Sequence, residues 1–401
     1  ARVKVCDPTL IDTDKNKENC KRYPKGNWKP TGLLQQYGDG DQFHFGLMTG
    51  SYARNISGGV LRKNPGTITD EIRVDTDGAF REKNTDGTFR DHPYRPRGGT
   101  RNQSSAQSPP GIINTLNYMR IYGYDYDDQS YLGSDGDNCT YQLTSITENN
   151  CTSWGNPMSE VFFESIRYFA GQSANYAYTA SPSKDNELGL PLAAFQDPLN
   201  ANNYCSPLNV VMFNAAVSDN EEDLRGASVA SINATGTVAG LTNTVGQHEG
   251  INGNSYFVGK MVGSSPTPTG DANGFELCTG KTVGAFGDIS GICPEGPTLG
   301  GTYLSAGLAH HARTTRIRTD AAVAGVVPAN DTRSLKVNSY GIQLATNTPQ
   351  LVIEGAGQRV VLQPIYRLNL GPGNVGGGGL VDLRYVRPPD VVGNLVRGKV
   401  Y

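Results

Sequence analysis

The sequence lacks the features that would place it in a membrane or on nucleic acid. No run approaches the ~20 consecutive apolar residues that a membrane-spanning helix needs. The 35 Lys and Arg residues are outnumbered by 38 Asp and Glu residues, which gives a net charge of −3. No concentrated basic field is present to hold a phosphate backbone. We therefore expect neither a transmembrane segment nor a nucleic-acid partner.

Motifs for catalysis are missing as well. The chain contains no Gly-x-Ser-x-Gly elbow, no phosphate-binding loop and no His-Glu-x-x-His pair. It has only five His residues, and no nucleophile stands out beside a base. We therefore expect a protein that is not an enzyme.

Apolar and charged residues are both scarce, at 37% and 18% of the chain. Globular chains average about 45–50% and about 25%. Their place is taken by 50 Gly and 23 Pro residues and by many Asn, Ser and Thr residues, which favour turns and surface loops. This composition is typical of a secreted, loop-rich protein with much β-structure.

Seven cysteines are present, and six of them form local pairs. The pairs are Cys6 with Cys20, Cys139 with Cys151, and Cys278 with Cys293. Each pair encloses a polar loop, no Cys-x-x-Cys zinc pattern occurs, and disulfides persist only in oxidising compartments. We predict three disulfides and an extracellular protein, with Cys205 either free or paired outside this sequence.

The clearest helix lies at 157–170. Asn156 is a good N-cap, Pro157 suits the first helical position, and Gly171 favours a left-handed cap at the far end. An apolar stripe at helical spacing consists of Met158, Val161, Phe162, Ile166 and Phe169. We expect this stripe to pack over a sheet.

Helical and strand patterns alternate along the middle of the chain. The order is helix, strand, helix, strand, at 157–170, 208–217, 299–312 and 335–345. The run at 208–217 is nearly continuously apolar, which is typical of a parallel strand buried on both faces. We predict an α/β fold with a doubly wound core and long β-rich and loop-rich insertions, with Val210 to Phe213 buried in a central strand.

The predicted organisation begins with an N-terminal strand and disulfide-loop segment, 1–65, that packs on the core. The α/β core consists of residues 154–225 and 286–353. Polar insertions occupy 66–153 and 226–285, and a C-terminal β segment occupies 354–401. The insertions are too polar and Gly-rich to build a core. We also expect parts of a longer protein before residue 1, where the chain opens abruptly on a strand, and after residue 401.

Acidic residues follow the apolar run at 208–217. Asp219, Glu221 and Asp223 stand at the carboxyl end of this strand, where α/β sheets place ligands. Carboxylate oxygens are ligands that calcium prefers. These three residues are the candidate metal site, and calcium is the one cofactor to consider.

A run rich in tyrosine lies in the insertion 66–153. Tyr side chains suit surface contacts, because the ring is large and rigid and the hydroxyl group tolerates water. The candidate binding patch is Tyr122, Tyr124, Tyr126 and Tyr131. The alternative is that these rings merely cover the protein's own loops.

Several stretches of the sequence occur in an order that one family shares. They read RVKVCDPTL, ENCKRY and WKPTGLLQQY within the first 37 residues, GGVLR at 58–62, WGNPMSEVFFESIRYFAG at 154–171, CSPLNVVMFNAAVSDNEEDL at 205–224, FGDISGICPEGPTLGGTYLSAGLAHHARTTRIR at 286–318, and KVNSYGIQLATNTPQLVI at 336–353. Together they resemble the PilY/PilC family of type IV pilus tip-associated proteins.

The resemblance implies an extracellular protein at the pilus tip or the bacterial outer surface that supports pilus assembly and surface adhesion. Its partners would be minor pilins or the major pilin at the tip, and a host or abiotic surface. The N-terminal half of that family is similar to a von Willebrand factor A fold, so the α/β core would be von Willebrand factor A-like. The C-terminal β-propeller of the family is not evident in this chain.

The chain departs from the A domains that bind metal. It has no Asp-x-Ser-x-Ser motif, it carries Asn156-Pro157-Met158 where related domains often have Thr-Pro-Leu, and it carries Asn214 where they have Asp. No metal-dependent adhesion site is therefore carried over from the resemblance.

Two other functions remain open. A secreted β-rich carbohydrate-active hydrolase would need two carboxylates facing a cleft. A eukaryotic or viral surface glycoprotein would carry glycans at its Asn-x-Ser/Thr sites. Activity assays and the mass of the intact protein distinguish both from a pilus protein.

Overall fold

The computed structural model describes most of the chain up to residue 344 and short strands beyond it. The described residues are 5–9, 11, 18–38, 42–71, 111–125, 130–131, 147–175, 182–262, 279–293, 296, 299–344, 351–355, 358–362, 369–371, 374–376, 390–392 and 395–397.

Six α-helices occur among the described residues. They are α1 Leu33–Gly38, α2 Ile112–Tyr118, α3 Met158–Phe169, α4 Pro182–Glu187, α5 Val238–His248 and α6 Leu304–Thr314. Short 3₁₀ helices are η1 Ile68–Glu71, η5 Glu222–Gly226, η6 Ala230–Ile232, η7 Phe286–Asp288 and η8 Ala324–Val326. The predicted helices at 157–170 and 299–312 are thus confirmed, with ends shifted by a few residues.

The strands pair into small sheets. They are β1 Cys20–Arg22, β2 Trp28–Pro30, β3 Phe45–Thr49, β4 Val60–Gly66, β5 Tyr124–Asp125, β6 Ser130–Tyr131, β7 Leu208–Asn214, β8 Ser255–Val258, β9 Lys260–Met261, β10 Thr279–Thr282, β11 Ile289–Ser290, β12 Val337–Gln343, β13 Leu351–Gly355, β14 Gln358–Leu362, β15 Asn369–Gly371, β16 Asn374–Gly376, β17 Asp390–Val392 and β18 Leu395–Arg397. Each sheet formed by these strands has two members.

The pair β7 and β12 is parallel, whereas the other strand pairs are antiparallel. Leu208 lies opposite Val337 at one end and Asn214 opposite Gln343 at the other. Two parallel strands need a long crossover connection, and α5 and α6 both lie between β7 and β12 in the sequence. The fold is therefore mixed α/β, with small sheets.

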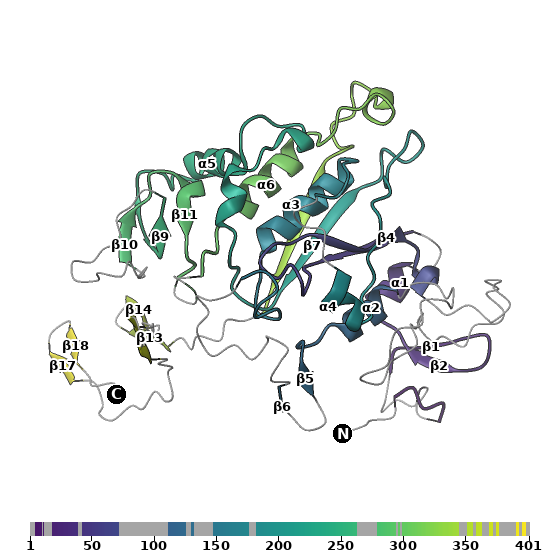
Figure 1. Cartoon of the computed structure of the whole chain (residues 1–401), viewed down its shortest axis with the longest axis horizontal. Helices are drawn as coiled ribbons and strands as arrows, with labels where there is room; N and C mark the ends of the chain where they lie inside the picture. The colour runs from purple at the N-terminus through teal and green to yellow at the C-terminus, as the bar shows by residue number, and fades with distance from the viewer. Residues whose placement is uncertain are drawn as a thin grey trace.

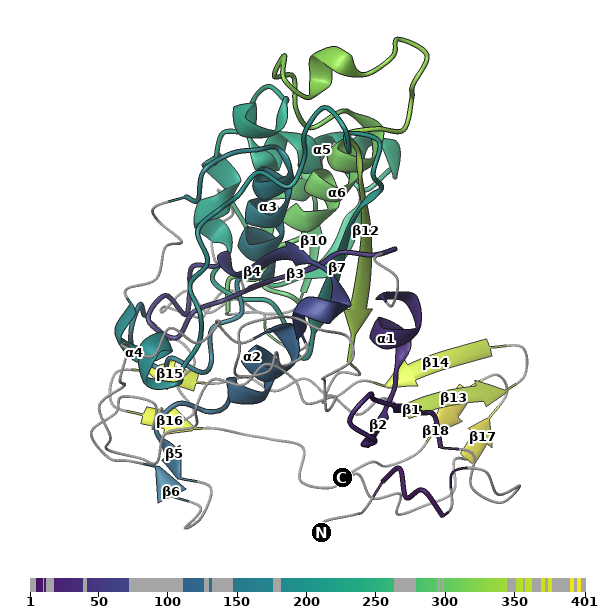
Figure 2. The ribbon, with the colours of Figure 1, turned by 90° about the vertical axis from the view of Figure 1, so that its right-hand side faces the viewer.

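The main hydrophobic core lies between the β7–β12 pair and the helices. In the two views, α3, α5 and α6 lie together on one side of the two strands (Figures 1 and 2). The core residues are Phe162, Phe163, Ile166, Ala170, Leu199, Leu208, Leu224, Val229, Ile232, Val238, Leu304, Leu308, Ala312, Ile317, Val323, Leu335 and Val337. The stripe predicted on the first helix packs here through Phe162 and Ile166, which are 1% and 0% exposed.

The prediction that β7 is buried on both faces is wrong. Val210 and Met212 pack against the core, but Val211 and Phe213 are 60% and 62% exposed. Successive residues of a strand point to opposite faces, and the helices cover one face only. An apolar run in the sequence could not reveal this one-sidedness, because both faces of β7 carry apolar side chains.

Residues 226–285 contribute more core than their composition suggested. Val229, Ile232 and Val238 are each 0% exposed and belong to the same cluster as α3 and α6. The backbone of α5 lies so close to α6 that a Cβ added to Gly307 would meet the Thr242 nitrogen at 2.3 Å. Small residues let α5 and α6 pack closely although the sequence of this segment has few large apolar side chains. The expectation of little core is therefore wrong for this segment.

The start of α3 also differs from its prediction. The helix begins at Met158, Pro157 occupies the cap position, and no side chain of that residue caps the helix. Gly171 does adopt the left-handed conformation, with φ of 72°.

No helix among the described residues has both the length and the apolar character that crossing a membrane requires.

Candidate functional site

The acidic residues after β7 were the predicted metal site, and the structure gives each a different environment. Asp219 is 3% exposed. Its Oδ1 accepts hydrogen bonds from the Asn156 backbone nitrogen at 2.8 Å and from Asn220 Nδ2 at 2.9 Å. Burial nevertheless raises the pKa of Asp219 to about 6. Asp219 thus fastens the segment before α3 to the segment after β7.

Glu221 is fully buried and supplies the cap that Asn156 does not. Its Oε1 accepts the Ser159 backbone N–H at 2.6 Å, and its Oε2 accepts the backbone N–H and the hydroxyl group of Thr302 at 2.8 and 2.9 Å. One carboxylate therefore joins the amino end of α3 to the segment just before α6, which stabilises the positive ends of both helices. Burial raises the pKa of Glu221, and both of its oxygens accept hydrogen bonds.

Asp223 is the exposed member of the predicted set. It faces Glu160 of α3, which is 0% exposed and within hydrogen-bonding reach of the Asp223 carboxyl group. Burial, and next the charge of Asp223, raise the pKa of Glu160 to about 9. Glu160 carried no signal in the sequence beyond its place on a helix, so it was missed.

A third carboxyl group joins this pair. Ser57 donates its hydroxyl hydrogen to Glu148 Oε1, and the Gly58 backbone N–H donates to Glu160 Oε2 at 2.9 Å. Burial raises the pKa of Glu148, and the charge of Asp223 acts in the same direction.

The predicted combination of Asp219, Glu221 and Asp223 is thus not brought together as a ligand set. Within the described part of the chain, one group of three His, Cys, Asp or Glu side chains has potential ligand atoms that all lie within 4.8 Å of one another, namely Cys6, Glu18 and Cys20. Two of its members are joined as a disulfide, so their sulfur atoms are not thiolate ligands.

The cysteines agree with an oxidising environment. Cys6 and Cys20 form a disulfide with their Cα atoms 5.9 Å apart, as predicted. Cys151 and Cys293 are also disulfide-bonded, whereas Cys139 and Cys278, their predicted partners, lie outside the described residues. Cys205 is free and exposed.

The tyrosine run is divided between interior and surface. Tyr122 is 8% exposed, its hydroxyl group donates to Glu187, and its ring contacts Tyr52 with the centroids 6.1 Å apart. Tyr124 is half-buried in β5 and lies opposite Tyr131 of β6. Tyr126 and the side chain of Tyr131 lie outside the described residues. A contact role for the run stays a prediction, although Tyr122 offers little surface to a partner.

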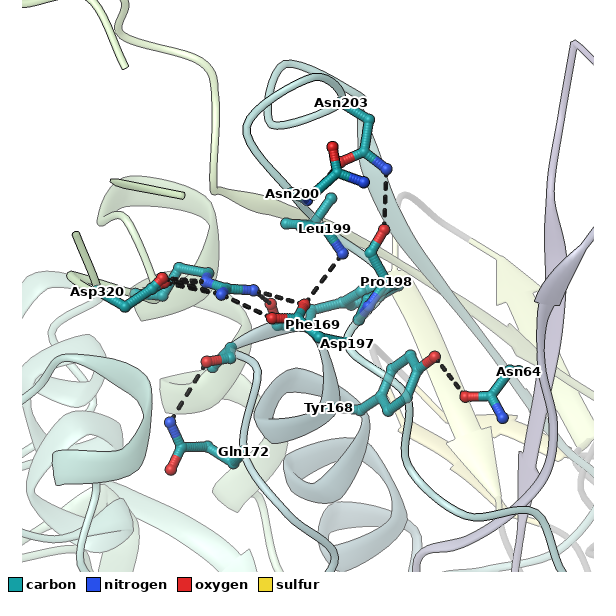
Figure 3. Close-up of polar contacts among 12 residues, drawn as sticks. Asn64, Tyr168, Phe169, Gln172, Asp197, Pro198, Leu199, Asn200, Asn203 and Asp320 are labelled. Carbon is teal, nitrogen blue, oxygen red and sulfur yellow. Dashed lines mark hydrogen bonds and ion pairs between the residues drawn. The ribbon is translucent and has the colours of Figure 1, made fainter. Parts of the chain in front are cut away.

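A second polar network at the carboxyl end of α3 was not foreseen (Figure 3). Arg318 is 7% exposed, binds both oxygens of Asp197 at 2.8 and 2.9 Å, and contacts Asp320 at 2.7 Å. Burial alone would raise the pKa of Asp197, but its bonds with Arg318 hold that pKa below the usual value. No sequence pattern could have paired residues 197 and 318.

A surface pocket of about 520 Å³ adjoins this network. Its lining includes Tyr168, Gln172, Phe195 and Asp197, and the Tyr168 hydroxyl group donates to Asn64 Oδ1 at 2.8 Å. The lining combines aromatic rings with polar groups, among them the Asp197 carboxylate, and pairs no nucleophile with a base. It can accommodate a side chain of a partner but shows no arrangement for catalysis.

Comparisons with known proteins identify relatives of the chain. A family profile described as PilY1 homolog, second domain, matches residues 45–312. The type IV pilus biogenesis factor PilY1 homolog of Xylella fastidiosa strain Temecula1 is 26% identical over 386 residues, which cover 90% of this chain and 23% of that protein. The chain therefore spans about a quarter of the length of this relative. No solved structure matches the chain.

Proposed function

Because the chain belongs to the PilY1 homologue family, as the match over residues 45–312 shows, we propose that it serves type IV pilus biogenesis at the pilus tip and in surface adhesion. The single observation that carries this proposal is that match. It includes α3, β7, α5 and nearly all of α6, and therefore most of the main core.

We further propose that the protein works outside the cell. Three disulfides, of which Cys6 and Cys20 form one and Cys151 and Cys293 each form half of another, would persist only in an oxidising compartment. The partners proposed are minor pilins or the major pilin at the tip, and a host or abiotic surface.

A von Willebrand factor A-like core belongs to the same proposal. The parallel pair β7 and β12 with α3, α5 and α6 on one side is compatible with a portion of such a fold. Domains of this kind commonly present ligands at the carboxyl end of the strands, and Asp219 lies there, because Asn156 binds both Asp219 and Asn214 at the end of β7.

We also propose that the protein binds rather than catalyses. The described residues present surface pockets lined largely by polar side chains, which favours a contact surface. Purified protein should therefore show no turnover of sugar, peptide or ester substrates. Turnover that one carboxylate or His substitution abolishes would instead support the alternative of a secreted hydrolase.

The experiment that tests the pilus function uses a strain from which the gene is deleted. Complementation with the parental gene should restore surface pili and attachment to a surface, as counted by electron microscopy and by an adhesion assay. If the deletion changes neither pilus number nor attachment, the proposal is wrong.

A matched pair of variants in the same strain tests the tyrosine run. Replacing Tyr124, Tyr126 and Tyr131 with Ser should reduce attachment while secretion stays at the parental level. Tyr122→Phe, which keeps the buried ring, is the control and should attach normally. Parental attachment by the triple variant would mean that these rings only cover the protein's own loops.

A further inference from the structure

We propose that the surface pocket at the carboxyl end of α3 binds a lysine side chain of a partner protein. The pocket has a volume of about 520 Å³. It is lined by residues 171–174, which follow the helix, by residues 194–197 and by Tyr168. The inference rests on the proposed binding role of the protein and names the chemical group that this pocket takes.

The first argument is the balance of charge at the pocket. Arg318 binds two carboxylates, that of Asp197 at 2.8 and 2.9 Å and that of Asp320 at 2.7 Å. One guanidinium group cannot neutralise both, so one negative charge is left uncompensated. Asp197 lines the pocket, and its side chain is 43% exposed. This excess charge is therefore open to a cation from outside.

Other charges near the pocket do not cancel the excess. Arg167 donates to the Ser173 carbonyl oxygen at 3.0 Å, but its charge is already paired with the buried Glu164 carboxylate at 2.8 Å. Among the described residues that line the pocket, none is Lys, Arg or His. The last carbonyl groups of a helix carry partial negative charge, and α3 ends at this pocket. The pocket thus favours a cation over a neutral or acidic group.

The acceptor atoms of Asp197 favour an ammonium group over a guanidinium group. Asp197 Oδ1 accepts hydrogen bonds from Arg318 and from the Leu199 N–H at 3.0 Å, whereas Oδ2 accepts from Arg318 alone. Each carboxylate oxygen offers about two acceptor sites, so the site that remains is on Oδ2. A second guanidinium group would need both oxygens for a bidentate pair. An ammonium group is a compact charge that can bind a single oxygen.

The walls of the pocket suit the rest of a lysine side chain. The rings of Tyr168 and Phe195 meet edge to face with their centroids 5.1 Å apart, and aromatic rings both attract cations and pack against methylene groups. Gln172 is exposed and donates through Nε2 to the Ala170 carbonyl oxygen at 3.3 Å, which leaves its side-chain oxygen as a second acceptor. Figure 3 shows Tyr168, Gln172 and Asp197 gathered at the end of the helix.

Amide NMR spectra of the isotope-labelled, purified chain test the proposal. The probe is Nα-acetyl-lysine methylamide, and the matched probes are the corresponding arginine compound and the uncharged norleucine compound. The lysine probe should shift the side-chain amide signals of Gln172 and Gln196 in a saturable manner. The arginine probe should bind more weakly, and the norleucine probe on the order of tenfold more weakly or less, because it lacks the charge.

Two pairs of variants locate the site. Gln196→Lys places a positive charge in the exposed lining and should weaken lysine binding on the order of tenfold or more. Gln36→Lys makes the same change in a different pocket and should keep the parental affinity. Asp197→Asn should also weaken binding on the order of tenfold. Asp320→Asn removes the same charge from the Arg318 network outside the lining and should weaken binding by less than about threefold. Melting temperatures check that the four variants fold.

Several outcomes would overturn the proposal. The parental chain could show no saturable shift with the lysine probe, or it could bind the norleucine probe equally well. Unchanged lysine binding in Gln196→Lys and Asp197→Asn would assign the binding to another site. The assay uses the purified chain alone, so its failure is distinguishable from a failure of the pilus function, which is measured by pilus number and attachment in the deletion strain.

Discussion

The two faces of the β7–β12 pair differ in what covers them. One face carries Leu208, Val210 and Met212 and packs under the helices α3 and α6. The other carries Val211 and Phe213, and it is open to solvent. Parallel strands are normally covered on both faces. A strand can thus have the composition of a fully buried element and still bury only one of its two faces.

The open face is a continuous apolar surface. Tyr340 and Ile342 of β12 lie opposite Val211 and Phe213 in the register and are 55% and 48% exposed. Leu344 follows them and is 48% exposed. Asn209 and Asn338, joined at 3.1 Å, bound the surface at the amino end of the strands. Both faces of the β7–β12 pair therefore carry apolar residues, and the faces differ in whether helices or solvent cover them.

The largest effect is expected from the covered face. Phe162→Ala removes a ring that is 1% exposed in the main core. Truncating a buried Phe typically lowers the free energy of unfolding by about 3–5 kcal/mol, a large share of the ~5–15 kcal/mol of a whole domain. Denaturant unfolding followed by fluorescence measures the loss. A melting temperature close to that of the parent would show that α3 does not hold the core.

A somewhat smaller effect is expected from Asp219, in the acidic segment that follows β7. Burial raises the pKa of Asp219 from 3.8 to about 6 in the folded protein, so the native state binds more protons than the unfolded state between these values. The resulting stability is present below pH 3.8 and is lost as the pH rises through about 6. Two pKa units correspond to about 3 kcal/mol.

Asp219→Asn tests this pH dependence. The amide oxygen can still accept the hydrogen bonds from Asn156 and Asn220, but the group no longer titrates. Thermal melts across the acidic range should show a flatter stability profile for the variant than for the parent. Parallel profiles would mean that Asp219 titrates at its ordinary pKa.

The smallest effect is expected on the open face. Phe213→Ser changes a side chain that is 62% exposed, so the free energy of unfolding should change by no more than about 0.5 kcal/mol. The variant should bind less of a fluorescent dye that reports exposed apolar surface. A loss as large as that of Phe162→Ala would show that something covers this face.

The sequence predicted the helices and strands better than the contacts that they make with one another. Helix α3, the strands β7 and β12 and the left-handed Gly171 follow from local patterns and are found close to where they were expected. Local spacing also foresaw the Cys6–Cys20 disulfide. Each of these depends on residues that are near one another in the chain.

The rest depends on contacts between distant residues. Glu221 lies 62 residues from Ser159, whose N–H it accepts, and Arg318 lies 121 residues from Asp197. No local pattern encodes such pairs. The surroundings of the predicted metal residues depend on such contacts too, because Glu221 accepts the N–H groups of Ser159 and Thr302 and Asp223 lies beside Glu160.

Thiol labelling most directly tests the central contrast between the two faces of β7. In a Cys205→Ser background, the four single variants Val210→Cys, Val211→Cys, Met212→Cys and Phe213→Cys are exposed to a maleimide reagent under native conditions. Cysteines at 211 and 213 should react rapidly, and those at 210 and 212 should react much more slowly, in strict alternation. Equal protection of all four would mean that both faces are covered, and equal reactivity would mean that the helices do not pack on the sheet.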